Sequence, residues 1–255
     1  MDDASHVSGT DSLPRVIYSL WLQGIENAPP IVRLNFARWA KLNPTYELRI
    51  FDEPAVRRSL SGLPLAIDEL TPQVISDLLR SVLLSSSGGV WVDASVFPAR
   101  PLDDWLPEYV GTGGFFAFER PGPDRAISSW FLAATANNRM MRSWRNDVIN
   151  YWSTPRVMSE GIPDDPVAAV STWRDTYPYF WFHYLFQRLL DTDPAFANAW
   201  QRCSKLPALP AIMMQARCAQ EPLLGIGELA NIAALAPVQK LDWRASYPLD
   251  ALRAL

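Results

Sequence analysis

Three polar residues stand out by type and spacing: Asp77 and Arg80 within an apolar helical pattern, and Asp93 after a short apolar run. Residues three apart share one face of a helix, so Asp77 and Arg80 can act as a pair. A Gly-Gly pair at 88–89 ends the helical pattern, and residues 90–92 then read as a buried strand that Asp93 follows. Ligands of open α/β sheets bind at the carboxyl ends of strands. The spacing therefore predicts that the three side chains converge on a ligand rich in hydroxyls and phosphates.

A purely structural interpretation of the same residues stays open. Asp77 and Arg80 would then form an ordinary ion pair on a helix surface, which contributes little to stability. Asp93 would be a loop acid that caps the following segment. The succession of helix, Gly-Gly turn, strand and acid favours the functional interpretation.

The elements that must position these residues can be read from the same sequence. Residues 15–20 predict a strand, Pro29 and Pro30 open a helical pattern through Leu42, and residues 46–51 predict a second strand. Proline is tolerated in the first turn of a helix because the N–H it lacks would have no partner there. A strand–helix–strand unit of this length predicts a parallel pair with a right-handed crossover.

The helix that carries Asp77 and Arg80 has a clear start, with Thr71 as N-cap and Pro72 at the first helical position, and it is expected to run to about Ser86. Further strands are expected at 115–119 and 130–134. Further helices are expected at 138–152, at 166–190 with a break near 178, at 227–235 and near the C-terminus.

Alternating strands and helices predict an α/β fold: one domain, residues 14–255, with a mixed, mostly parallel sheet, flanking helices and a helical C-terminal portion. Residues 1–13 are polar and predict a disordered leader.

Composition argues against several classes of protein. A net charge of −4, a pI near 5.2 and scattered basic residues argue against nucleic-acid binding. Two cysteines without a CxxC pair exclude a disulfide framework and argue against a zinc site. The start of the chain lacks the pattern of a signal peptide, and no apolar stretch approaches the ~18 residues of a membrane span. We expect a cytoplasmic protein without a transmembrane segment, whose membrane association, if any, would be peripheral.

The central motif resembles that of the capsular polysaccharide synthesis proteins, which are similar to glycosyltransferase family 32 and have the GT-A fold. The resemblance is carried by Asp-x-x-Arg, Gly-Gly, an apolar strand and Asp-x-Ser between Asp77 and Ser95. Other segments also fit this resemblance, which with them extends over most of residues 14–243. These segments are 14–24, 39–46, 130–134, 179–186 and 240–243. The resemblance implies a GT-A-like domain.

The resemblance also implies an activity. It indicates a glycosyltransferase of capsular polysaccharide biosynthesis that moves a sugar, expected to be a hexose, from a nucleoside diphosphate-sugar to a saccharide or related acceptor hydroxyl. A UDP-sugar is favoured as donor, and the anomeric configuration is expected to be retained. No strong enzymic base is then required, since the leaving phosphate can accept the proton of the acceptor.

A divalent cation, Mn²⁺ or Mg²⁺, is implied as the group that bridges the donor phosphates. By resemblance Asp93 stands at the first acid of an Asp-x-Asp motif, and Ser95 stands at the second, where a hydroxyl is a weaker ligand than a carboxylate. Asp77 and Arg80 are implied to hold hydroxyls of the donor sugar, and the planar guanidinium of Arg80 also suits a phosphate.

Four further residues are candidates with two interpretations each. Trp21 and Gln23 follow the first strand and could stack on and hydrogen-bond the base, whereas core packing explains Trp21 equally well. His183 lies in an aromatic run as a core histidine or, because neutral imidazole is a common ligand, as a third metal ligand. Lys240 is either the late basic residue that related enzymes fold over the diphosphate or a solvated surface lysine.

Two other functions stay open beside the transferase. A non-catalytic sugar-nucleotide-binding or scaffold protein of a polysaccharide locus is compatible with the weak metal ligand Ser95. A glycosidase needs two positioned carboxylates, and no pair of acids in the sequence is singled out for that role.

Overall fold

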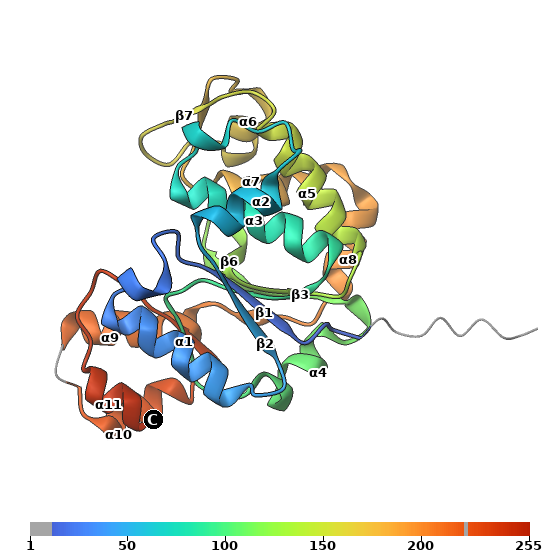
Figure 1. The fold of residues 1–255 in the computed structure, drawn as a ribbon. Coiled ribbons are helices and arrows are strands. Elements are labelled where there is room, and N and C mark those ends of the chain that lie inside the picture. The colour runs from blue at the N-terminus through green and yellow to red at the C-terminus, as the bar shows by residue number, and fades with distance from the viewer. Residues whose placement is uncertain (1–11, 222–223) are drawn as a thin grey trace, which may run out of the picture.

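The computed structural model describes residues 12–221 and 224–255, which form a six-stranded sheet between layers of helices (Figure 1). The strand order is β2–β1–β3–β6–β5–β9, and three of the five pairings are parallel. The predicted α/β class with a mixed, mostly parallel sheet is therefore confirmed. The strands of the sheet are β1 (Val16–Leu20), β2 (Glu47–Phe51), β3 (Gly89–Val92), β5 (Phe115–Gly122), β6 (Arg125–Ala134) and β9 (Leu206–Pro207).

One face of the sheet is covered by a helical layer that Figure 1 shows above it, and the other face by a second layer below. The upper layer contains α2 (Glu53–Leu60), α3 (Pro72–Ser86), α5 (Arg139–Tyr151) and α7 (Trp181–Thr192). The lower layer contains α1 (Pro30–Leu42) and α4 (Leu106–Val110). Two more helices follow in the chain. Helix α6 (Pro166–Thr172) lies between α5 and α7, and α8 (Pro194–Arg202) comes directly after α7.

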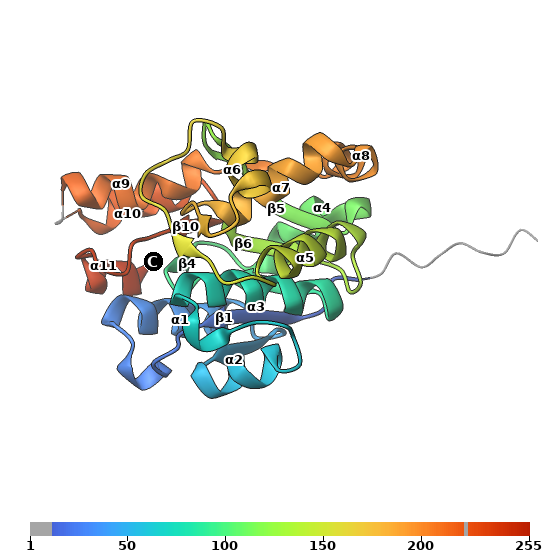
Figure 2. The same cartoon turned by 90° about the horizontal axis from the view of Figure 1, so that it is seen from above.

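The C-terminal portion is helical, as predicted, and its last helix, α11, packs beside α1 (Figure 2). It brings one short strand back to the centre of the molecule, where β10 pairs antiparallel with β4. A second small sheet joins β7 to β8. These elements are α9 (Met213–Gln220), α10 (Ile226–Ala233), α11 (Leu249–Ala254), β4 (Val96–Pro98), β10 (Val238–Lys240), β7 (Val157–Met158) and β8 (Thr176–Tyr177).

Strand β3 shows why the acid after it has a fixed position. All four of its residues are buried, as expected for a strand that is covered on both faces. Trp91 packs into the core between the sheet and the upper helical layer, among α3, α5 and α7. Val90 and Val92 pack into the core between the sheet and the lower layer. Burial on both faces fixes the register of the strand, and the register fixes where the strand ends.

The start of α3 and the turn after it follow the sequence closely. The Thr71 hydroxyl accepts a hydrogen bond from the Val74 amide at 3.4 Å, which confirms the predicted N-cap. Gly88 has φ +66°, and a Cβ atom there would lie 2.5 Å from the Ala136 amide nitrogen. The turn therefore requires glycine, both for its conformation and for the approach of the neighbouring backbone.

The remaining expectations have mixed outcomes. The helical stretch predicted over 166–190 with a break near 178 is confirmed as two helices, α6 and α7, with β8 and Pro178 between them. The sequence did not predict α2, α8 or the pairing of β4 with β10. The predicted leader falls mostly on residues 1–11, outside the described residues, and the single domain of 14–255 stays a prediction. In the described part of the chain, no helix is long and apolar enough to cross a membrane.

Candidate functional site

A cleft of about 570 Å³ opens at the carboxyl ends of β1 and β3, where the sequence predicted a ligand site. One side is formed by the chain after β1, Leu20 to Gln23, and by the first turns of α3. Residues 240–244, here called the 240–244 segment, form another side. Asp93, Ala94 and Ser95 also line the cleft.

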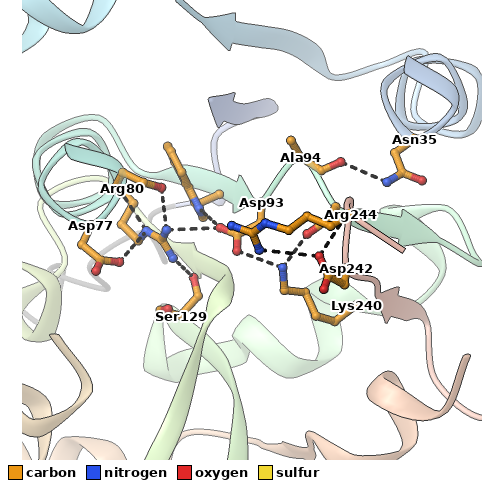
Figure 3. Close-up of polar contacts among 12 residues, drawn as sticks. Asn35, Asp77, Arg80, Asp93, Ala94, Ser129, Lys240, Asp242 and Arg244 are labelled. Carbon is orange, nitrogen blue, oxygen red and sulfur yellow. Dashed lines mark hydrogen bonds and ion pairs between the residues drawn. The ribbon is translucent and has the colours of Figure 1, made fainter. Parts of the chain in front are cut away.

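The turn that carries Asp93 is held by the main chain on several sides. The Asp93 amide donates to the Trp130 carbonyl on β6 at 2.9 Å, and the Val96 amide donates to the Asp93 carbonyl at 2.9 Å. The buried Asn35 amide on α1 donates to the Ala94 carbonyl at 2.9 Å (Figure 3). Asp93 is thus presented by a rigid turn, as a preorganised site requires.

Arg80 lies on one side of Asp93 and is almost fully enclosed, with 4% of its side chain exposed. Its Nη2 atom is 3.2 Å from Asp93 Oδ1 and 2.7 Å from the Ser76 hydroxyl. Its Nη1 atom donates to the Ser129 carbonyl at 2.5 Å (Figure 3). Because protein acceptors occupy most of its N–H groups, Arg80 holds Asp93 and adds positive charge rather than offering a free fork to a phosphate.

Asp77 lies behind Arg80 and does not line the cleft. Its Oδ1 atom is 3.3 Å from Arg80 Nε, and 5% of the side chain is exposed. Burial raises the pKa of Asp77 to about 7, against the opposing charge of Arg80. The predicted pairing with Arg80 is confirmed, whereas the predicted contact of Asp77 with donor hydroxyls has no support in its position.

Lys240 lies on the opposite side of Asp93 from Arg80. It ends β10, and the pairing with β4 places it across from Val96, directly after the Asp93 turn. Its Nζ atom donates to the Ser95 hydroxyl at 2.5 Å and lies 3.3 Å from Asp93 Oδ2. The two cations therefore contact different oxygens of one carboxylate.

These neighbours keep Asp93 ionised. Burial alone would raise the pKa of its carboxyl, but the charges of Arg80 and Lys240 and the hydrogen bond from the Trp91 indole outweigh burial and lower it. Asp93 is therefore a fixed anion between two fixed cations.

Two tryptophans form an aromatic part of the cleft lining. Trp21 and Trp243 meet edge to face, with ring centroids 5.4 Å apart, and both line the cleft. Trp243 is 39% exposed, and the Arg244 guanidinium stacks on its ring at 4.6 Å. Gln23 also lines the cleft and is exposed. The geometry thus places both predicted base-binding residues, Trp21 and Gln23, in the cleft.

His183 does not line the cleft, so the structure does not bring it to Asp93 and Ser95 as a metal ligand. Burial lowers the pKa of His183 to about 3, helped by the charges of Arg125 and Arg80. The imidazole is therefore neutral, and its ring lies edge-on to Phe180. The ring lies among aromatic side chains, as the interpretation as a hydrogen-bonded core histidine expected, but its buried Nδ1 atom has no hydrogen-bond partner among the described residues.

The residues present do not fit a divalent cation as expected. Asp93 and Ser95, two of the three expected ligands, both contact the Lys240 ammonium. Within residues 12–221 and 224–255, no three His, Cys, Asp or Glu side chains gather in a way that could hold a metal ion. A mononuclear Mn²⁺ or Mg²⁺ site built of carboxylates is therefore not formed by this arrangement.

Comparison with known proteins agrees with the resemblance in the sequence. The family model described as "Capsular polysaccharide synthesis protein" matches residues 3–160, more than half of the chain. The chain belongs to this family. It is 29% identical over 171 residues to the O-glycosyltransferase PaGT of Phomopsis amygdali, which covers 58% of the chain and 41% of that protein. It is 26% identical over 159 residues to the O-glycosyltransferase braB of Annulohypoxylon truncatum, which covers 53% of the chain and 37% of that protein.

The chain thus spans about two fifths of the length of the curated relatives it matches. Among solved structures it is similar to PaToxG glycosyltransferase, with a TM-score of 0.45, 18% identity and coverage of 74% of each chain. It is also similar to an active-site mutant of LgtC, with a TM-score of 0.42, 11% identity and coverage of 94% of each chain.

Several cleft residues of this family member were not predicted as site residues from the sequence. Arg244 and Trp243 line the cleft next to Lys240, and Tyr179 and Gln215 line it from elsewhere. The resemblance reached Trp243 and stopped one residue before Arg244. Asn35, which does not line the cleft but holds the Asp93 turn, left a weaker signal, as a polar residue on the apolar face of a predicted helix. Gln215 left none.

Proposed function

We propose that this protein is a glycosyltransferase that moves a sugar from a nucleoside diphosphate donor to an acceptor hydroxyl. The observation that carries the proposal is the cleft at the end of β3, where Arg80 and Lys240 surround Asp93 and Arg244 lies close by. Positive groups fixed in advance suit a leaving diphosphate, whose negative charge grows as the sugar departs. Membership of the family and the O-glycosyltransferase names of its relatives support the same activity.

Each side of the cleft has a role in this proposal. Trp21 and Trp243 offer faces and edges to the nucleotide base. Lys240 and Arg244 lie on the 240–244 segment, where they can contact the diphosphate. Asp93 keeps 26% of its side chain exposed and can accept a hydrogen bond from a hydroxyl of the ribose or of the sugar.

The finer features of the reaction follow from the resemblance and are part of the proposal. They are transfer of a hexose with retention of configuration, a UDP-sugar as favoured donor, a saccharide acceptor in capsular polysaccharide biosynthesis, and a cytoplasmic location. The Mn²⁺ or Mg²⁺ implied by the resemblance finds no matching ligand set in the cleft, so no step is assigned to it.

Donor cleavage tests the proposal directly. The purified protein is incubated with a panel of UDP- and GDP-sugars, in parallel with Mn²⁺, with Mg²⁺ and with EDTA, and the released nucleoside diphosphate is measured. We expect release from one donor and a loss of roughly 100-fold or more in kcat/KM for Asp93→Asn. Asp250→Asn is the matched control, because its carboxylate is 97% exposed on α11.

The same assay separates the transferase from the alternative, a non-catalytic protein that binds sugar nucleotides. Thermal shift on addition of UDP and GDP is measured beside cleavage. Nucleotide binding without release from any donor, under all three metal conditions, would favour the non-catalytic alternative. Neither binding nor release would contradict both.

A further inference from the structure

The Lys240 ammonium occupies the place between Asp93 and Ser95 that the resemblance assigns to a metal ion. Its Nζ atom lies 2.5 Å from the Ser95 hydroxyl oxygen and 3.3 Å from Asp93 Oδ2. Divalent ions bind oxygen at about 2.0–2.6 Å. An ion bound to both of these oxygens would therefore have to displace the ammonium.

The position of Lys240 is set by the fold. Lys240 is opposite Val96 in the β4–β10 pair, and the Leu241 amide donates to the Ser95 carbonyl at 2.9 Å. The preceding residue, Gln239, is fully buried, and its side-chain amide bonds main-chain groups of Met214, Pro210 and Ile232. A strand anchored in this way delivers the ammonium to the Asp93 turn whether or not a ligand is present.

The charges around Asp93 also oppose a divalent ion. Arg80 Nη2 at 3.2 Å and Lys240 Nζ at 3.3 Å already place two positive charges on one carboxylate. Among the residues that the structure describes, the second carboxylate that lines the cleft, Asp242, has the Arg244 guanidinium 3.8 Å away. Each of these two carboxylates therefore already has a cation beside it, and a divalent ion placed here would be repelled strongly by those like charges.

We infer that Lys240 replaces the divalent cation, so that this protein binds and cleaves its donor without a metal. The inference deepens the proposed function and rests on it. The bond between the sugar anomeric carbon and the phosphate oxygen breaks, and its electron pair stays on the diphosphate. The acceptor oxygen forms the new bond to that carbon, and the acceptor proton passes to the diphosphate. The Lys240 ammonium donates hydrogen bonds to the phosphate oxygens, with Arg244 beside it.

Binding of nucleoside diphosphates tests this without relying on turnover. The protein is treated with EDTA and desalted, its metal content is checked by mass spectrometry, and UDP and GDP are titrated by calorimetry with and without Mn²⁺ or Mg²⁺. We expect the affinity of the wild-type protein to change less than about 2-fold with metal. We expect Lys240→Met to lower the affinity roughly 10- to 100-fold, because a hydrogen bond to a charged group is lost.

Two variants sharpen the assignment. Lys41→Met removes another of the three lysines, on an exposed face of α1, and should bind as the wild type does. The double variant Ser95→Asp with Lys240→Met removes the ammonium and supplies a second acid. We expect its nucleotide affinity to rise at least 10-fold on adding Mn²⁺, because two carboxylates then lie within reach of one ion.

The outcomes separate the inference from the function on which it rests. Donor cleavage or nucleotide binding that EDTA abolishes and Mn²⁺ or Mg²⁺ restores in the wild-type protein would overturn the inference and leave the glycosyltransferase in place. Unchanged affinity in a folded Lys240→Met would also overturn it. The metal titration needs only the wild-type chain, so it decides even if that variant does not fold. Absence of binding and cleavage under every condition would overturn both proposals.

Discussion

Two cations contact Asp93 from opposite sides, and their surroundings differ. Arg80 is 4% exposed and donates to the Ser76 side chain and to the carbonyls of Ser76 and Ser129. Lys240 is 24% exposed, and its polar partners among the described residues are the side chains of Asp93 and Ser95. The two cations therefore have different roles. Arg80 fixes the carboxylate, whereas Lys240 can exchange protein oxygens for those of a ligand at small cost.

The two sides also differ in origin. Arg80 comes from α3, one turn after Ser76 and 13 residues before Asp93, so that side of the cleft is built from neighbouring sequence. Lys240 reaches Ser95 across a separation of 145 residues, through the pairing of β10 with β4. The strand that carries Lys240 is anchored by the buried Gln239, whereas the residues after it, Asp242 to Arg244, are partly or fully exposed. These exposed residues form the part of the cleft that can adapt to a ligand, here called the adaptable side.

The largest difference is expected in stability. Arg80→Met leaves Asp77 buried without a partner and removes the inner contact of Asp93, so we expect the free energy of unfolding to fall by about 3–5 kcal/mol. Lys240→Met breaks a partly exposed pair and should lower it by less than about 1 kcal/mol. Urea denaturation of both variants checks this. Equal losses would remove the distinction between the two cations.

The pH dependence of stability reports on the buried side of the site, where Asp77 pairs with Arg80. The pKa of Asp77 is about 7 in the folded protein, above the roughly 4 expected in the unfolded chain, so the folded state binds the proton more tightly. The free energy of unfolding should therefore decrease between about pH 4 and pH 7, with a contribution from this residue of roughly 2–4 kcal/mol. Asp77→Asn should remove that contribution while an amide oxygen remains for Arg80.

Urea midpoints of the wild type and of Asp77→Asn at several pH values between 4 and 8 measure this contribution as a difference. Asp250→Asn serves as control, since its carboxylate is 97% exposed and should leave the pH profile unchanged. If the profiles of Asp77→Asn and the wild type run parallel, Asp77 is ionised throughout the range and the assigned pKa is wrong.

The two sides of the cleft also differ in how much of them could be predicted from the sequence. The N-cap at Thr71, the Gly-Gly turn and the buried run of β3 are local signals, and the structure confirms each of them. The spacing of Asp77 and Arg80 predicted their pairing. It could not show that Asp77 faces the core, because both faces of α3 are apolar enough to be buried.

The rest of the site depends on contacts that no local pattern specifies. A three-residue strand such as β10 has too few residues to show a period, so its pairing with β4 was not predicted. The contact between Lys240 and the expected metal ligands was missed for that reason, although the resemblance had drawn attention to the lysine. His183 shows the reverse: a metal-binding residue type that tertiary packing keeps out of the cleft.

A smaller effect is expected at Trp243, on the adaptable side. Trp243→Ala removes the partly exposed ring that meets Trp21, and we expect the affinity for UDP or GDP to fall by about 1–2 kcal/mol, as for other stacked bases. Inorganic pyrophosphate carries no base, so its affinity should be unchanged in the same variant. Calorimetry with both ligands measures the two effects. Equal losses for pyrophosphate would mean that the ring positions the 240–244 segment instead of binding the base.

The smallest effect is expected at Arg244, whose side chain is 71% exposed and has Asp242 at 3.8 Å. Arg244→Ala should lower the affinity for pyrophosphate and for UDP alike, by roughly 2- to 5-fold at low ionic strength, because an exposed charge contributes little. At 0.5 M NaCl the difference from the wild type should nearly disappear, since salt screens exposed charges. Arg253→Ala, an exposed arginine on α11, controls for net charge. A loss that persists in high salt would mean that ligand binding buries Arg244, and the adaptable side would then close over the diphosphate as a second fixed wall.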